Sequence, residues 1–502
     1  MRARAACLVA LVASGVAAAA ASAADCRLHW RVAGGVADPR GTHLACRDGD
    51  PACDADGAAD GGCAVSLALC LGGASCPAAP AGAIRVRGGE AARRVAGALG
   101  GLAAPGAGEE TCTAPAAVRL ALGRHRRRRT TLRAVAARGA GRVAPARLRL
   151  ACVRPARRAA ARATAVVVTT DFETGVLATA RVAPPHAVVR RPDVPIHADA
   201  VVRVADRVYV VNRFLGDNIQ ILDPARGFAT VLQCSTGAGS NPHDLLLAGP
   251  RKAYVTRYDE KALWVVDPRA KDCTRFFRRA IDLSPYGDAD GLPEMDQMAL
   301  VGDRLFVSLE RLDRNRRFAP AGRSALVVVD TTTDAVVGTV ELSGANAFGD
   351  ASGLVREPGT GKLVVAEAGD IFATGDGGLE RVDPETLRAE GFFVTEDALG
   401  GNVTDFVLVS PTQGFAIVFV ATNPPRNVLV EFDPSRGTLR RRLLTSVYNL
   451  PDVALAPDGT LWLADQTLPA PGIRIFDPQT ARQLAAGPVD VGLPPFSIGF
   501  LP

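Results

Sequence analysis

Residues 253–268 read Ala-Tyr-Val-Thr-Arg-Tyr-Asp-Glu-Lys-Ala-Leu-Trp-Val-Val-Asp-Pro. They have the pattern of a strand, a polar loop, a second strand and an Asp-Pro turn. Six such stretches occur, and their turn aspartates stand at positions 223, 267, 330, 383, 433 and 477, a mean spacing of about 51 residues. Because Pro presets a type I turn and Asp can accept from the following N–H groups, we expect each turn Asp to cap its own turn.

Further apolar segments complete each unit. One strand precedes each pair, as at 244–247, and one follows the turn, as at 336–342. Units of this length with four short strands are typical of β-propeller blades. The segments 165–172 and 175–179 lack a preceding strand, whereas 496–501 is a strand with nothing after it. Pairing the two ends gives a seventh blade and removes the open sheet edges, so we predict a closed seven-bladed propeller over residues 165–502.

Aspartates recur at the start of the innermost strands. Asp199, Asp244, Asp296 and Asp452 each stand nine residues before a second strand, and Asp405 is equivalent in a unit with a longer turn; Ser352 and Ser497 take the other two places. In a propeller these positions meet at the mouth of the central channel. Gathered carboxylates repel one another. Either they hold a cation or a cationic ligand, or each Asp accepts hydrogen bonds from the adjacent blade.

Other polar residues break the repeat and are expected on the same face. His197 and His243 precede their aspartates, and Glu294 precedes Asp296. Arg257 and Glu310 follow second strands. We predict ligand binding at the channel mouth and on this face by a set of ten residues: Asp199, Asp244, Asp296, Asp405, Asp452, His197, His243, Glu294, Arg257 and Glu310. The histidines have an alternative interpretation as hydrogen-bonded structural residues. No catalytic residue is identified.

The N-terminal third has a different composition. Residues 1–24 combine Arg2 and Arg4, an apolar run and a small-residue cleavage site, which predicts a secretory signal peptide. Eight of the ten remaining cysteines lie between 26 and 152, and Cys234 and Cys273 come later. Even numbers on both sides predict four disulfides in the first domain and one in the second, with the pairing of the first eight open. We expect a small disulfide-rich antiparallel β-sandwich at 25–155, a linker at 156–164 and the propeller at 165–502, an all-β chain.

Two motifs in this first domain could bind ions. Asp54, Asp56 and Asp60 alternate with glycines and small residues, which predicts a calcium loop; the alternative is a surface turn. The run 124–129, Arg124-His-Arg-Arg-Arg-Arg129, falls between two expected strands, 118–122 and 131–136, and is expected at a hairpin tip. It could contact an anionic surface, or it is simply a solvated tip.

Charge divides the chain at the same place. Residues 25–165 carry 23 Arg and no Lys against 10 acidic residues, a net charge of +13, whereas residues 166–502 carry a net charge of −9. No aromatic residues are interleaved with the basic run, and export argues against a genomic target, so nucleic acid is not an expected partner. No uninterrupted apolar stretch of about 18 residues follows the leader, so no membrane span is expected.

The segments Ser240-Asn-Pro-His-Asp-Leu-Leu-Leu247 and Lys252-Ala-Tyr-Val-Thr256 resemble the YVTN-repeat seven-bladed propellers. The resemblance covers about residues 165–502 and implies architecture rather than activity. The signature itself is kept only in part, as Tyr254-Val-Thr-Arg257 and Tyr209-Val-Val-Asn212. Gluconolactonase-type propellers are similar in organisation. That likeness implies a divalent metal on the channel axis held by Glu, Asn and Asp, a trio that no motif locates here.

Several activities lack their motifs. There is no Gly-x-Ser-x-Gly, no His-Glu-x-x-His and no Cys-x-x-Cys-His, and the Gly-Thr-Gly-Lys segment at 359–362 departs from a phosphate-binding loop. We therefore expect neither haem nor nucleotide, with Ca²⁺ or another divalent cation as the candidate cofactor. Two functions remain. One is a secreted or periplasmic, non-catalytic binding protein for a polar or cationic ligand or partner. The other is a metal-dependent propeller hydrolase or lactonase.

Overall fold

The structure is a computed structural model that describes residues 163–349, 353–358 and 360–501 in full. Nearer the N-terminus it describes the backbone of eight strands between residues 27 and 153. The predicted signal peptide at 1–24 lies outside the described residues, as does nearly all of the predicted linker at 156–164. The described helices are short, namely α3 Glu396–Leu399 and the 3-10 turns η3 Pro224–Arg226, η4 Cys273–Arg275, η5 Ser284–Tyr286 and η6 Arg314–Arg316.

The eight N-terminal strands form two four-stranded sheets. One contains β1 Arg27–Ala33, β3 Gly62–Gly72, β5 Glu110–Cys112 and β6 Ala116–Ala121, and the other contains β2 His43–Arg47, β8 Ala146–Val153, β7 Arg127–Ala136 and β4 Ile84–Arg87. Two expectations are wrong. β2 runs parallel to β8, so the second sheet is mixed; a parallel pair needs a long connection, and about 100 residues separate these strands. β6 and β7 belong to different sheets, so they do not form the predicted hairpin.

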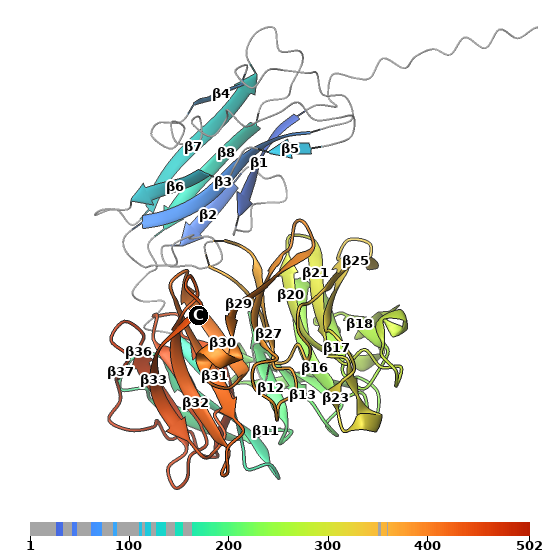
Figure 1. Cartoon of the computed structure of the whole chain (residues 1–502), viewed down its shortest axis with the longest axis vertical. Coiled ribbons are helices and arrows are strands. Elements are labelled where there is room, and N and C mark those ends of the chain that lie inside the picture. Colours follow the sequence, from blue (N-terminus) through green and yellow to red (C-terminus); the bar gives the residue numbers. More distant parts are fainter. Residues whose placement is uncertain are drawn as a thin grey trace, which may run out of the picture.

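Residues 164–501 form seven four-stranded sheets, the predicted seven blades (Figure 1). We number the blades in chain order. Blade 1 contains β9 Thr164–Thr170, β10 Gly175–Arg181, β11 Val188–Ile196 and β38 Pro495–Leu501. Blade 2 contains β12 Ala200–Val204, β13 Val208–Asn212, β14 Asn218–Asp223 and β15 Ala229–Ser235. Blade 3 contains β16 Pro242–Gly249, β17 Lys252–Arg257, β18 Ala262–Val266 and β19 Phe277–Asp282.

The remaining four blades repeat this order. Blade 4 contains β20 Met295–Val301, β21 Arg304–Leu309, β24 Ala325–Asp330 and β25 Ala335–Glu341, with the inserted pair β22 Leu312–Asp313 and β23 Ala319–Pro320. Blade 5 contains β26 Leu354–Arg356, β27 Leu363–Glu367, β28 Gly378–Asp383 and β29 Arg388–Thr395. Blade 6 contains β30 Asn402–Ser410, β31 Gln413–Val420, β32 Arg426–Asp433 and β33 Thr438–Ser446. Blade 7 contains β34 Val453–Leu455, β35 Leu461–Asp465, β36 Gly472–Asp477 and β37 Arg482–Gln483.

The ends of the propeller meet in blade 1, as predicted. The C-terminal strand β38 pairs antiparallel with β9, and Ser497, Ile498 and Gly499 lie opposite Val168, Val167 and Val166. β38 is thereby the innermost strand of a blade whose other three strands come from the start of the propeller. This pairing satisfies the edge of β9, which would otherwise be open to another strand.

The turn aspartates cap their turns as expected. All six accept a hydrogen bond from the backbone N–H two residues later, at 2.8–3.0 Å: Asp223, Asp267, Asp330, Asp383, Asp433 and Asp477. At Asp330 these N–H and hydroxyl donors lower the carboxyl pKa to about 2. The side chain thus replaces the ladder bonds that end at the turn.

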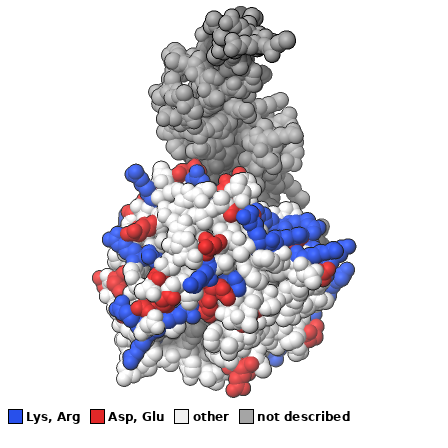
Figure 2. Space-filling model, turned by 90° about the vertical axis from the view of Figure 1, so that its right-hand side faces the viewer, with Lys and Arg blue, Asp and Glu red and all other residues white. Residues whose placement is uncertain are grey.

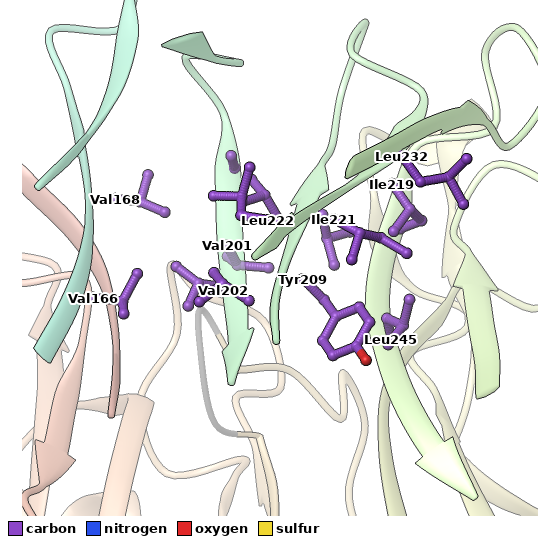
Figure 3. Packing of buried hydrophobic residues seen from close by; sticks show 14 of the residues in the cluster. Val166, Val168, Val201, Val202, Tyr209, Ile219, Ile221, Leu222, Leu232 and Leu245 are labelled. Atoms are coloured by element: carbon purple, nitrogen blue, oxygen red, sulfur yellow. The ribbon is translucent and has the colours of Figure 1, made fainter. Parts of the chain in front are cut away.

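The core lies between neighbouring blades. Val166, Val202, Tyr209 and Leu245 come from blades 1, 2 and 3, and all are nearly or completely buried. Figure 3 shows these side chains and their neighbours filling the space between the sheets. Strands buried on both faces read as continuous apolar runs, which is why β13 and β17 contain Val-Tyr-Val-Val and Ala-Tyr-Val-Thr.

A disulfide joins Cys234 on β15 to Cys273 in η4, which ties blade 2 to blade 3. The predicted pairing of the two late cysteines is therefore confirmed. The side chains of the eight earlier cysteines lie outside the described residues.

We predict that the closing strand tolerates no side chain at Gly499. A Cβ there would stand 2.4 Å from Cγ2 of Val204 and 2.9 Å from Cγ2 of Val202, both on the neighbouring innermost strand. Valine side chains have few alternative rotamers, so Gly499→Ala should lower the free energy of unfolding by about 1–3 kcal/mol. Chemical denaturation measures this change.

Gly249 provides the matched control. It also lies on an innermost strand, and a Cβ there would meet no atom within 4 Å. Gly249→Ala should leave the unfolding midpoint nearly unchanged. Equal stability of the two variants would contradict the close contact between β38 and β12.

Candidate functional site

The top face is the end of the propeller where the innermost strand of each blade begins. The loops that join second to third strands return to this end, because Tyr258 N donates to Asn241 O and Glu310 N donates to Glu294 O. The predicted site residues that the structure describes therefore share one end of the molecule. The blade order, and not their separation in sequence, brings them together.

Carboxylates and one hydroxyl bridge neighbouring blades at this end. In each case a side-chain oxygen on one innermost strand accepts from a backbone N–H on the next. The pairs are Asp244 Oδ2 with Met298 N at 2.9 Å, Asp405 Oδ2 with Val453 N at 2.7 Å, Asp452 Oδ2 with Ile498 N at 2.6 Å, and Ser497 Oγ with Val202 N at 3.2 Å. The three aspartates are almost completely buried. The hydrogen-bonding interpretation is confirmed for these three; their role in ligand binding stays a prediction.

A cation does lie among the carboxylates, and it belongs to the chain. Arg203 on β12 donates through Nε to Asp244 Oδ1 at 2.6 Å and through Nη2 to Gln297 Oε1 at 2.9 Å. Burial opposes its charge, but Asp244, and then Asp452 and Asp296, outweigh burial and raise the pKa of Arg203. The guanidinium therefore reaches from blade 2 to blades 3 and 4. It neutralises part of the negative charge of the aspartates at the blade junctions, which we call the ring: Asp244, Asp296, Asp405 and Asp452. Sequence reasoning missed it, although a lone Arg inside the apolar strand Ala-Val-Val-Arg-Val was the signal.

Asp199 and His197 lie apart from these junctions. The Asp199 side chain is 31% exposed and pairs with Arg213 of its own blade at 2.5 Å. The His197 ring nitrogen Nδ1 contacts the backbone of Asp199, and the His197 N–H donates to Asn212 Oδ1 at 2.9 Å. Both residues hold the loops of blade 2. Ser352 lies outside the described residues.

Blades 3 and 4 depart from the repeat at one cluster. His243 Nδ1 donates to Asp296 Oδ1 at 3.0 Å, and the His243 ring stacks on Tyr258 with centroids 4.2 Å apart. Tyr258 OH donates to Glu310 Oε2 at 2.8 Å. A histidine nitrogen and one oxygen each from Asp296 and Glu310 lie within 4.8 Å of one another. In the described part of the chain this is the one group of three or more such residues with the spacing to hold a metal ion.

β-Bulges place these side chains. The ladder between β16 and β17 shifts register between Pro242 and Leu245, and that between β20 and β21 shifts between Met295 and Met298. A bulge turns the side chains within it away from the regular alternation. Asp244 and Asp296 have equivalent places in these bulges, yet the Asp244 carboxylate bonds to Met298 N of the next blade whereas the Asp296 carboxylate faces His243.

Glu294 and Arg314 flank the cluster. Glu294 has a positive φ of 43° and accepts from Leu312 N at 3.3 Å. Burial, followed by the nearby Asp288 and Asp290, raises the pKa of Glu294 to about 8. Arg314 hydrogen-bonds Asp259 and lies 3.7 Å from Glu294 Oε1. The cluster is therefore surrounded by further acidic side chains, and Arg314 pairs with some of them.

Arg257 is committed to the fold of its own blade. Its Nε donates to Thr236 O at 2.8 Å, and its guanidinium lies 4.2 Å from the centre of the Trp264 ring. A Glu260 oxygen stands 3.3 Å away. The side chain is 8% exposed. Arg257, which the sequence predicted to contact a ligand, is therefore buried and connects two loops. Its role in ligand binding stays a prediction.

A buried carboxyl pair lies in blade 5. Burial, and then Glu380, raises the pKa of Glu367 to about 9. Glu380 accepts hydrogen bonds from Ser343 N, Ser343 Oγ and Gly391 N. With this raised pKa Glu367 keeps its proton at neutral pH, and its Oε2 accepts from Gly344 N at 2.5 Å. The sequence located Glu367 at the end of a second strand but gave no sign of the pair.

The N-terminal motifs cannot be placed. Asp54, Asp56 and Asp60 lie outside the described residues, as does the first half of the run at 124–129. Figure 2 shows acidic and basic side chains interspersed over one face of the described surface. None of the described helices is long and apolar enough to cross a membrane.

Neither a protein-family model nor a curated protein matches this chain. Solved structures match over the propeller. One is a candidate 6-phosphogluconolactonase of Bacteroides fragilis, at 14% identity over 69% of this chain and 100% of its own, with a TM-score of 0.45. Another is a protein of Lactobacillus plantarum, at 13% identity over 68% and 99% of the two chains, with a TM-score of 0.48. A third is hydrazine synthase of Kuenenia stuttgartiensis, at 15% identity over 57% and 75%, with a TM-score of 0.41. These likenesses carry no information on activity.

We predict that Arg203 stabilises the ring. Arg203→Met leaves the buried Asp244 without its cation, so the free energy of unfolding should fall by about 2–4 kcal/mol. Arg203→Met combined with Asp244→Asn should recover part of the loss, because Asn still offers an oxygen to Met298 N. Chemical denaturation of both variants gives the coupling energy.

Arg190→Met is the control for this prediction. Arg190 pairs with Asp490 at the surface, where their side chains are 57% and 66% exposed. Its loss should cost less than about 1 kcal/mol. If Arg203→Met were no more destabilising than Arg190→Met, the guanidinium would have no part in holding the ring.

We also predict that Glu367 makes the folded chain less stable as the pH rises. Its folded pKa of about 9 exceeds the ordinary value of 4.5, so the folded chain binds this proton more tightly than the unfolded chain. The stabilisation is fully present below the ordinary pKa and is lost as pH rises toward the folded value. Glu367→Gln cannot ionise and should therefore gain stability relative to wild type between about pH 5 and about pH 9, by at most about 1.4 kcal/mol per pH unit. Unfolding midpoints across this range measure the difference. Glu341→Gln, at a side chain 69% exposed, should show no such trend, and a flat difference for Glu367→Gln would contradict the prediction.

Proposed function

We propose that this chain is an exported, non-catalytic binding protein that presents the top face of its propeller to a partner. The observation that carries the proposal is the distribution of exposed apolar side chains. Among the described residues thirteen large hydrophobic side chains are exposed. Nine of them lie in loops at the top face: Phe172, Phe214, Leu215, Phe318, Ile371, Phe372, Val447, Tyr448 and Leu468.

These side chains occupy the tips of loops on six different blades or blade connections. Phe214 and Leu215 follow β13, and Ile371 and Phe372 follow β27, where they are 42–78% exposed. The other four exposed hydrophobics lie on or beside the outermost strands. Apolar tips among charged groups suit a macromolecular partner with a polar surface and apolar contact points.

The hydrogen bonding of the ring supports binding rather than catalysis. Asp244, Asp405 and Asp452 are almost completely buried and accept from the backbone of the next blade, which is the arrangement of structural residues. The Cys234–Cys273 disulfide supports export, because disulfides persist in oxidising compartments. The signal peptide predicted at 1–24 agrees with this location.

A metal-dependent hydrolase is the second candidate, on one observation. Asp296 does not bond to the next blade as the other buried aspartates do, and within the described residues its buried Oδ2 has no hydrogen-bond partner. A carboxylate of this kind beside His243 is a geometry that could hold an ion and leave room for substrate water. The two candidates make opposite predictions about turnover.

A displayed library of random peptides tests the first candidate. Peptides selected on the wild-type chain should bind a variant carrying Phe214→Ser, Leu215→Ser and Phe372→Ser at least about tenfold more weakly, because the apolar contact points are lost. A control variant with Val337→Ser and Leu484→Ser, at exposed positions of the outer strands, should bind as wild type does. Equal loss in both variants would contradict a top-face surface. Turnover in a screen of lactones and esters, abolished by chelator and by Asp296→Asn, would favour the hydrolase.

A further inference from the structure

The cluster of His243, Asp296 and Glu310 has the donor geometry of a metal site. His243 Nδ1 and Asp296 Oδ1 are 3.0 Å apart, which is close to the spacing of two ligands on one ion. Zn–N and Zn–O bonds of about 2.0–2.2 Å put tetrahedral ligands roughly 3.3 Å apart. All three donor atoms lie within 4.8 Å of one another, so an inward movement of about 1 Å brings them onto one ion.

A second observation points to a missing ligand. Asp296 is 2% exposed, and its Oδ2 makes no hydrogen bond within the described part of the chain. Leaving a carboxylate oxygen buried and unbonded is unfavourable, and the equivalent oxygens of Asp244, Asp405 and Asp452 are all bonded to the next blade. Among the four aspartates of this series that are almost completely buried, Asp296 is therefore the one without such a bond in the described part of the chain.

The surroundings orient the other two side chains. Tyr258 OH holds Glu310 Oε2 at 2.8 Å, and the Tyr258 ring stacks on His243. Partners of this kind fix metal ligands before the ion arrives. The His243 side chain remains 15% exposed, which gives the site an opening at its edge.

The nearby arginines have other partners. Arg203 is bound to Asp244 and Gln297, and Arg314 is bound to Asp259. Within the described residues the ion pairs of Asp296 are limited to His243. In the described part of the chain no arginine is ion-paired with Asp296, so a metal ion does not have to displace a guanidinium to bind there.

We propose that His243, Asp296 and Glu310 bind one divalent transition-metal ion, with Zn²⁺ as the preferred ion. An imidazole nitrogen with two carboxylates favours zinc over Ca²⁺ or Mg²⁺, which take oxygen ligands. Three protein ligands leave one position of a tetrahedral ion open. This donor set contains histidine and joins blades 3 and 4, unlike the Glu, Asn and Asp trio on the channel axis that the gluconolactonase likeness implies. Metal binding does not depend on the peptide-binding proposal, because each is measured without the other.

Titration calorimetry of Zn²⁺ into the metal-free full chain tests the proposal. The wild type should bind an ion that His243→Gln and Asp296→Asn each lose or bind at least about tenfold more weakly. His197→Gln is the matched control, since His197 lies on the same face but bonds only to backbone and to its own loop. It should bind as wild type does, and comparison among variants removes any contribution of histidines and cysteines outside the cluster.

Further measurements keep the result decisive if one variant is unstable. Gln can still donate a hydrogen bond to Asp296 Oδ1, so His243→Gln should remain folded without metal, as its unfolding midpoint will show, and its loss of Zn²⁺ affinity then reports on the ligand. Co²⁺ in place of Zn²⁺ should give visible absorption bands in the wild type that His243→Gln abolishes. Unchanged Zn²⁺ binding by His243→Gln, the absence of Zn²⁺ binding by the wild type, or tighter binding of Ca²⁺ than of Zn²⁺ would overturn the proposal.

Discussion

The structure depends on how seven innermost strands meet around a narrow axis without leaving buried polar groups unsatisfied. N–H groups of these strands face the preceding blade in a buried setting and cannot reach water. Side-chain oxygens of Asp244, Asp405, Asp452 and Ser497 accept from these groups across four blade junctions. Charge is then the second problem, because these carboxylates are buried together. The Arg203 guanidinium donates to Asp244 and lies near the other carboxylates, so the ring is both hydrogen-bonded and partly neutralised.

This arrangement separates residues that build the propeller from residues that are free for other chemistry. In a repeat protein each blade contributes the same kind of side chain, so a shared role is first of all a structural one. Asp296 has the same place in the sequence repeat but faces His243 and Glu310 instead of the next blade. Asp244 lies in an equivalent β-bulge and still bonds to the next blade, so the feature that distinguishes Asp296 is the His243 side chain that faces it from blade 3.

The top face combines two kinds of surface. Its centre is polar and buried, with carboxyl groups such as Glu367 and Glu294 held partly protonated by burial and by neighbouring acids. Its rim carries apolar loop tips such as Phe214 and Phe372, which no core residue covers. Buried carboxyls fix the loops, and the fixed loops present the tips. Loops positioned by a rigid scaffold are where binding surfaces usually arise.

The sequence alone determined the number of blades, the closure of β38 on β9, the capped Asp turns and the late disulfide, because each rests on local spacing or on pairing of complementary ends. It also brought His243, Asp296 and Glu310 to one face. It could not separate Asp296 from Asp244 or Asp405, since all three have the same place in the repeat and lie at similar bulges, and the spacing does not show that His243 faces Asp296. Nor could it find the Arg203–Asp244 pair or the Glu367–Glu380 pair. These contacts join residues on different strands or different blades, and only the tertiary structure decides which buried charges face each other.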